Sequence, residues 1–213
     1  NIATALYEKD DLDGAIAEYR TAISQQPNYP LAHSNLGNAL TEKGALDEAI
    51  AECRIAIGQQ PDNPDAHYNL GVALDDKGDH DAAITEYRTT LRLQPAFPEA
   101  HSGLGDAFYA KGDADMAITE YRAAITQQPD LAEAHYSLGK TLEKKSDLDG
   151  AIAEYRTAIR QQAKYPEAQA ALADSERKYR DLIETTDTGF VIIDGEGRVL
   201  DANAKYVGLT GHD

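Results

Sequence analysis

Four histidines recur at a fixed interval, and their ring nitrogens are the first groups in the chain that could bind a metal. They stand 34 residues apart, at His33, His67, His101 and His135. One zinc ion needs its nitrogen ligands about 2 Å away, whereas packed helices of separate units already lie about 8–10 Å apart. We therefore predict that the histidines serve packing or surface contacts, and we expect no metal site.

Periodic charged pairs are the next candidates for chemistry. In each pair a glutamate precedes an arginine by two positions: Glu52 and Arg54, Glu86 and Arg88, Glu120 and Arg122. Residues two apart do not face each other on a helix, so these side chains either bridge to neighbouring units or are solvated. The sequence also has no glycine-rich phosphate loop, nucleophile elbow or HExxH motif. We predict no catalytic residue and no cofactor, and we do not expect the chain to be an enzyme.

A longer motif sets the interval at which these residues return. Ala-Ile-Ala/Thr-Glu-Tyr/Cys-Arg occurs five times, beginning at Ala15, Ala49, Ala83, Ala117 and Ala151. A unit of 34 residues is one supersecondary element that cannot bury its apolar face alone. The chain must therefore be a stack of repeats.

Each repeat predicts two amphipathic helices joined by a tight turn. Ala66, Leu70 and Leu74 have helical spacing, and Ala83 and Tyr87 resume that spacing after a break. The breaks contain a glycine that can adopt the left-handed conformation ending a helix, at Gly44, Gly78 and Gly112.

Prolines end the second helix of each repeat, because proline lacks an amide hydrogen and clashes with the preceding turn. They are Pro27, Pro61, Pro95 and Pro129. Asp10, Ser146 and Ala163 replace these turn residues elsewhere, so we expect looser turns there.

Small residues recur where two helices must approach closely. Gly37, Gly71, Gly105 and Gly139 lie in the first helix, where a bulkier side chain would hold the helices apart. Cys53 stands where the other repeats have tyrosine, and we predict that it is buried in the core.

Together, the small, aromatic and proline positions resemble the tetratricopeptide repeat, a helix-turn-helix unit of the same length. The family's order of leucine-glycine, alanine, aromatic and proline appears here as Leu70, Gly71, Ala83, Tyr87 and Pro95. The resemblance implies an all-α fold, a right-handed superhelix in which repeats form an α-solenoid. The array covers residues 1–165, with complete units at 30–63, 64–97, 98–131 and 132–165. Residues 1–29 form a partial unit, so we expect the chain to be a fragment that begins partway through a repeat.

The resemblance also implies a binding surface. In tetratricopeptide proteins the first helix of each unit lines a concave groove that contacts extended peptides. Carried onto this sequence, the groove residues are Asn35, Asn38, Asp65, Tyr68, Asn69, Asp75, Glu99, Asp106, Tyr109, Glu133 and Tyr136.

Two details of the groove bear on its ligand. Asn1, Asn35 and Asn69 form a series similar to the asparagine ladder by which the repeats of O-GlcNAc transferase hold a peptide backbone. The alternative, that asparagine is merely frequent at this position, stays open.

Some tetratricopeptide proteins bind a terminal carboxylate with lysine, arginine and two asparagines. Asn38 and Asn69 match the asparagines, but the basic positions are Ser34, Glu99 and Gly103 here, so we do not expect such a carboxylate clamp. Acidic side chains and tyrosines dominate the expected groove. They favour a basic or amphipathic peptide.

The end of the chain has different patterns. Residues 166–185 keep the first half of another unit before Ser175 and Glu176 take positions that should be apolar, which predicts a capping or linker helix. Residues 186–213 contain two short β-rich runs around Gly195 and resemble the start of a PAS sensor domain. With only about the first third of such a domain present, we expect a short β-hairpin or a disordered tail.

Composition limits the partners. A formal net charge of −17 would repel phosphate backbones and anionic membranes, and no apolar run approaches the roughly 20 residues that span a bilayer. The single cysteine is compatible with the reducing cytoplasm. We expect a protein or peptide partner, no nucleic acid and no membrane, with end-to-end self-association as an open alternative.

Two hypotheses for function follow. The first is an interaction scaffold that binds a peptide in its groove, as the docking or input region of a larger signalling protein. The alternative is the substrate-recruiting arm of an enzyme, such as an O-GlcNAc-transferase-like glycosyltransferase, whose catalytic domain lies outside this chain. The PAS-like tail favours the first.

Overall fold

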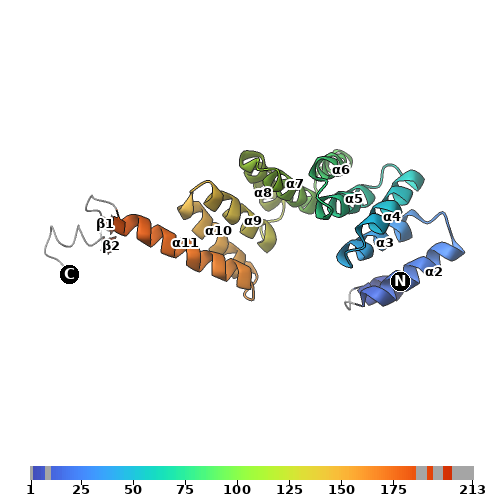
Figure 1. Ribbon diagram of the computed structural model, residues 1–213, viewed down its shortest axis with the longest axis horizontal. Helices are drawn as coiled ribbons and strands as arrows, with labels where there is room; N and C mark the ends of the chain where they lie inside the picture. Colours follow the sequence, from blue (N-terminus) through green and yellow to red (C-terminus); the bar gives the residue numbers. More distant parts are fainter. Residues whose placement is uncertain (1, 8–10, 186–190, 194–198, 203–213) are drawn as a thin grey trace.

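The protein is an all-α solenoid, as the repeats predict. A computed structural model describes residues 2–7, 11–185, 191–193 and 199–202. The helices pack side by side in chain order into a curved rod, with α2 near one end and α11 leading to the two strands at the other (Figure 1).

Each 34-residue frame supplies a first and a second helix. The first helices are α1 (Ile2–Tyr7), α3 (Pro30–Glu42), α5 (Pro64–Asp76), α7 (Pro98–Ala110) and α9 (Ala132–Lys144). The second helices are α2 (Leu12–Gln25), α4 (Leu46–Gln59), α6 (His80–Leu93), α8 (Ala114–Gln127) and α10 (Leu148–Gln161). Each helix packs against the next, so the stack has one continuous core.

The turns inside the repeats confirm the prediction for their glycines. Gly44, Gly78 and Gly112 have φ values of 78°, 86° and 84°. At Gly78 two backbone bonds close the helix end, from Gly78 N to Asp75 O at 2.8 Å and from Asp79 N to Leu74 O at 2.9 Å.

The looser turn expected at Ser146 is wrong. Ser146 takes the same left-handed conformation, with φ 66°, and its turn closes with the same two bonds at 2.8 and 2.9 Å. The stack therefore imposes the turn on a residue that disfavours it. The turn at Ala163 is also kept, since α10 ends at Gln161 just as α8 ends at Gln127. Asp10 lies outside the described residues.

The core confirms the close helix packing predicted from the small residues. The five motif alanines, Ala83 among them, are fully buried. A Cβ atom added at Gly105 would lie 2.6 Å from the Tyr121 ring, and one at Gly71 would lie 2.8 Å from the Tyr87 ring. Cys53 is likewise fully buried, and burial raises the pKa of its thiol to about 12.

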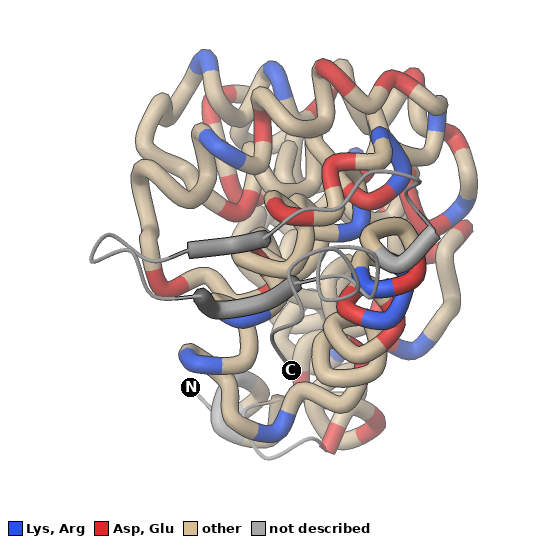
Figure 2. The backbone as a smooth tube through the Cα atoms, turned by 90° about the vertical axis from the view of Figure 1, so that its left-hand side faces the viewer, with Lys and Arg blue, Asp and Glu red and all other residues tan. Residues whose placement is uncertain are grey.

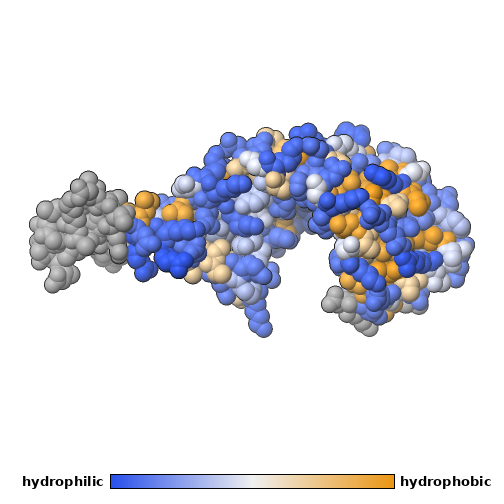
Figure 3. All heavy atoms as spheres, viewed as in Figure 1, coloured by the Kyte–Doolittle hydropathy of each residue, from blue (hydrophilic) through white to orange (hydrophobic). Residues whose placement is uncertain are grey.

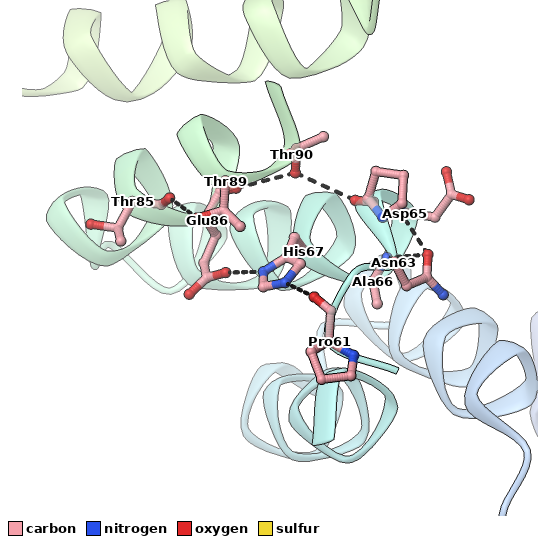
Figure 4. Close-up of polar contacts among 10 residues, drawn as sticks. Pro61, Asn63, Asp65, Ala66, His67, Thr85, Glu86, Thr89 and Thr90 are labelled. Atoms are coloured by element: carbon pink, nitrogen blue, oxygen red, sulfur yellow. Dashed lines mark hydrogen bonds and ion pairs between the residues drawn. The ribbon is translucent and has the colours of Figure 1, made fainter. Parts of the chain in front are cut away.

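The periodic histidines connect three elements of the stack. His67 Nδ1 lies 2.6 Å from Glu86 Oε2 in α6, and His67 Nε2 lies 3.0 Å from the carbonyl oxygen of Pro61 in the preceding loop (Figure 4). The same histidine–glutamate contact recurs in the other repeats, at His33 with Glu52, His101 with Glu120 and His135 with Glu154.

These contacts show where the periodic glutamates bind. Glu52, Glu86 and Glu120 are partly exposed, and each contacts the histidine of its own repeat. Arg88, by contrast, reaches the next unit, where it lies 5.7 Å from the centroid of the Phe108 ring. In the last repeat, the bond to Glu154 raises the pKa of His135 against the opposing effect of burial.

The chain ends in one long helix and a strand pair. α11 (Pro166–Thr185) packs on α10. Ser175 is fully buried, at the repeat position held by Ala107 and Thr141, so α11 keeps the packing of a first helix there. β1 (Val191–Ile193) pairs antiparallel with β2 (Val199–Ala202). None of the described helices is both long and apolar enough to cross a membrane.

The glycine–tyrosine contact predicts the effect of one added methyl group. Gly105→Ala should lower the stability of the array by roughly 1–3 kcal/mol, because the Tyr121 ring occupies the space for the new Cβ. Gly58→Ala is the matched control. A Cβ there meets nothing within 4 Å, so better helix propensity should leave stability unchanged or raise it by up to about 1 kcal/mol. Urea unfolding followed by circular dichroism would measure both, and equal midpoints would contradict the packing argument.

Candidate peptide-binding groove

A hollow of about 260 Å³ opens between the first helices of three successive repeats. It is lined from α5, α6, α7 and α9 and from the loop before α9. The lining residues are Tyr68, Val72, Asp75, Asp76, Tyr87, Glu99, Ser102, Gly103, Asp106, Leu131 and Glu133. We call this site the acidic hollow, because carboxylates from three helices converge on it while none of the described lysines or arginines lines it.

Asp106 is the most perturbed carboxyl group of the hollow. Burial, reinforced by the negative charges of Glu133 and Asp75, raises its pKa to about 6. The Tyr121 hydroxyl donates a bond of 2.7 Å to Asp106 Oδ1, which opposes part of the rise. The protein therefore holds a carboxylate where its charge is poorly solvated.

Asp75 is held in a similar way. Burial raises its pKa, and His80 Nδ1, which lies 2.6 Å from Asp75 Oδ1, acts in the opposite direction. His80 is the first residue of α6. It does not line the hollow.

Aromatic rings form one wall of the hollow. The Tyr68 ring lies 5.9 Å from the Tyr87 ring and 5.0 Å from the Phe97 ring, measured between centroids. Burial raises the pKa of Tyr68 to about 12, and the charges of Glu99, Glu133 and Asp106 add to the effect. Ring faces beside carboxylates suit an organic cation.

One repeat further along, three lysines gather around a tyrosine. Lys140 Nζ lies 5.4 Å from the ring centroids of both Tyr109 and Tyr136, and Lys144 Nζ lies 4.7 Å from that of Tyr109. Lys178 of α11 lines a cavity together with Tyr109, Lys140 and Lys144. We call Lys140, Lys144 and Lys178 the lysine patch. The groove residues expected from the sequence do not include this patch, although Lys140 stands at the repeat position of Asp106.

The structure divides the groove residues expected from the sequence into three sets. Tyr68, Asp75, Glu99, Asp106 and Glu133 line the acidic hollow. Tyr109 and Tyr136 lie under the lysine patch.

The remaining four, Asn35, Asn38, Asp65 and Asn69, lie on α3 and α5 outside the hollow. Asn38 Nδ2 donates to the Tyr7 hydroxyl at 2.7 Å, and Asn69 Nδ2 donates to Ser34 Oγ at 3.0 Å. Both amide groups therefore already bind neighbouring helices. Asn1, the first of the asparagine series, lies outside the described residues.

The polarity of the protein surface changes along the stack, and basic and acidic residues are mixed. Apolar residues gather over the N-terminal repeats, whereas the C-terminal half is mainly hydrophilic in the same view (Figure 3). Basic and acidic residues are interspersed along the described part of the backbone (Figure 2). Among the described residues, no three histidine, cysteine, aspartate or glutamate side chains are placed to hold a metal ion.

Comparison with protein families and solved structures places this geometry among known repeats. Models described as tetratricopeptide repeat or TPR repeat match residues 1–64, 75–112, 105–146 and 132–165. A PAS domain model matches residues 177–213. No curated protein matches the sequence.

Several solved structures are similar. MamA is 27% identical with a TM-score of 0.64, and the match covers 78% of this chain and 98% of MamA. YrrB, described as a TPR protein with an unusual peptide-binding site, is 25% identical with a TM-score of 0.61, over 79% of this chain and 87% of YrrB. TTC0263, a thermophilic TPR protein of Thermus thermophilus, shares the fold at 20% identity and a TM-score of 0.72, over 83% of this chain and 96% of that protein.

The family models together match residues 1–64 and 75–165, and the helix pairs and turns of the structure have the same period. The chain belongs to the tetratricopeptide repeat family.

Proposed function

We propose that the chain is a non-catalytic protein–protein interaction scaffold that binds an extended peptide in its groove, with a lysine or arginine side chain in the acidic hollow. The observation that supports this most directly is Asp106, a poorly solvated carboxyl group whose pKa is raised to about 6 among other acids. A cation bound there would relieve their mutual repulsion. Repulsion among these carboxylates lowers the stability of the fold, so we interpret the cluster as a binding site.

The dimensions of the hollow support a side chain as the ligand. Pockets for drug-sized molecules have volumes of about 300–1,000 Å³, and the hollow, at about 260 Å³, is smaller. The ring of Tyr68 adds an apolar wall for the methylene stem of lysine or arginine. The likeness to YrrB, whose description includes a peptide-binding site, supports the same conclusion.

Peptide binding should depend on the carboxylates of the hollow. A peptide with one lysine should bind more tightly than the same peptide with alanine, and raising the salt from about 50 to about 300 mM should weaken its binding. Glu133→Gln should reduce the affinity about fivefold, since it removes one charge from the lining. Fluorescence anisotropy with labelled peptides would measure these effects.

Asp149→Asn is the matched control for this experiment. Asp149 is exposed at the start of α10 and does not line the hollow, so its substitution should leave the affinity nearly unchanged. Preference for acidic peptides, or affinity that ignores salt, would contradict the proposal.

The raised pKa of Asp106 predicts how binding varies with pH. Below about pH 6 this group takes up a proton, so the affinity for a lysine peptide should fall between about pH 7.5 and about pH 5.5, while the lysine itself stays charged. Asp106→Asn should bind more weakly at the higher pH and flatten this pH dependence. Isothermal titration calorimetry would test both, with Asp149→Asn again as the control. An unchanged pH profile in Asp106→Asn would show that another group is responsible.

We also propose that the array is the docking or input region of a larger cytoplasmic signalling protein. The support is the PAS model match at residues 177–213, which begins within α11. Lys178 of α11 binds Glu143 of α9 at 2.7 Å, so the helix that leads into the PAS-like segment contacts the edge of the groove. The alternative, a recruiting arm of a glycosyltransferase, gives α11 no role beyond capping the stack.

Coupling between the groove and α11 has a measurable signature. Saturating peptide should slow amide hydrogen exchange in α11, because occupancy of the groove stabilises its contact with α9, and should leave α2 unchanged. Hydrogen exchange followed by mass spectrometry would detect the difference. Unchanged exchange in α11, with peptide bound, would reject the signalling role while leaving peptide binding intact.

A further inference from the structure

The sign of charge reverses at one repeat position between two adjacent repeats. Asp106 of α7 lines the acidic hollow, and the residue 34 positions later is Lys140 of α9. The next pair on the same helix faces is Ala110 and Lys144. Because equivalent positions of stacked repeats project alike, the groove passes from negative to positive within one repeat.

The lysines of α9 are not neutralised by the described part of the protein. Lys140 and Lys144 are exposed, and neither forms an ion pair with any residue that the structure describes. The contacts that hold them are with the Tyr109 and Tyr136 rings. Their ammonium groups therefore remain available to an anion.

Glu143, the carboxylate that lines the cavity together with Tyr109 and the lysine patch, already has partners. Its Oε2 accepts a bond of 2.9 Å from the Tyr155 hydroxyl, and its Oε1 lies 2.7 Å from Lys178 Nζ. Glu143 thus anchors Lys178, and within the described residues it leaves Lys140 and Lys144 without an acidic partner.

We infer that the ligand of the groove carries charges of both signs: a basic side chain in the acidic hollow and, about three residues away, a glutamate or aspartate on the lysine patch. This inference rests on the proposed function. In a chain with a net charge of −17, two exposed lysines facing one tyrosine form a local exception that suits a carboxylate.

The spacing follows from the geometry of the stack. Asp106 and Tyr109 lie about one turn apart on α7, and the lysines stand over Tyr109 from the next first helix. The rise of one turn is about 5 Å, and the lysine nitrogens lie 5.4 and 4.7 Å from the Tyr109 ring centroid. The two steps together come to roughly 10 Å, and an extended peptide advances about 3.3 Å per residue. A peptide of the form Lys-Ser-Ser-Glu therefore spans the two sites.

The test compares matched peptides by fluorescence anisotropy. The unaltered protein should bind a peptide containing Lys-Ser-Ser-Glu about fivefold more tightly than one containing Lys-Ser-Ser-Gln. In the double variant Lys140→Ala and Lys144→Ala this difference should disappear. Because both lysines are exposed, the variant should keep its fold, which circular dichroism would verify.

The double variant Lys77→Ala and Lys111→Ala is the control for the loss of two positive charges, since Lys77 binds Asp47 and Lys111 binds Asp81, and neither lysine lines the cavity of the lysine patch. It should keep the preference for the glutamate peptide. Equal affinity of the unaltered protein for the two peptides, both tighter than Ala-Ser-Ser-Glu, would overturn the inference and leave the basic-peptide proposal standing. Binding of none of the peptides would reject both.

Discussion

The contact between a helical glycine and a tyrosine ring determines how closely the two helices of a repeat approach. Gly71, Gly105 and Gly139 each leave room for the tyrosine of the following helix, and any side chain there would meet its ring. The same tyrosines also reach the groove. Tyr87 lines the acidic hollow, and the Tyr121 hydroxyl holds Asp106. One packing contact therefore builds the core and positions the charged surface above it.

The first complete repeat shows what happens without this tyrosine. Cys53 fills the core position there, with its sulfur against Gly37, but a thiol at this depth cannot reach a groove side chain. The carboxyl groups of the acidic hollow whose pKa is raised, Asp75, Asp76 and Asp106, belong to the later repeats, where the tyrosine is present. Core packing and groove electrostatics are thus linked through a single repeat position.

Features that the repeat itself carries could be predicted from the sequence. The helix pairs, the glycine turns and the buried alanines recur within one chain, so agreement among the units indicates which positions the stack constrains. The contact of His67 with Glu86 could not be predicted from the shared period of the two residues. It joins positions 19 apart, a distance set by how two helices cross and not by spacing along either.

The candidate site was predictable in outline only. Family resemblance named Asp106 and Tyr109 as groove residues, yet could not show that the first sits among acids and the second among lysines. That depends on which side chains from three helices converge in space. The prediction of a looser turn at Ser146 failed for a related reason. Packing in the stack imposes a left-handed conformation that the local propensity of serine disfavours.

The contact of Tyr87 with Gly103 has a consequence for the whole array. A Cβ atom at Gly103 would lie 2.7 Å from the Tyr87 ring, so the asparagine of earlier units has no room here. At the repeat position of Asp106, the two earlier units have Asn38 and Val72 and the next unit has Lys140. Units with the same helix pair present different chemistry in the groove. A bound peptide displaced by one unit would therefore meet side chains of different charge. Although the repeats share one backbone conformation, their side chains can fix the register of an extended ligand.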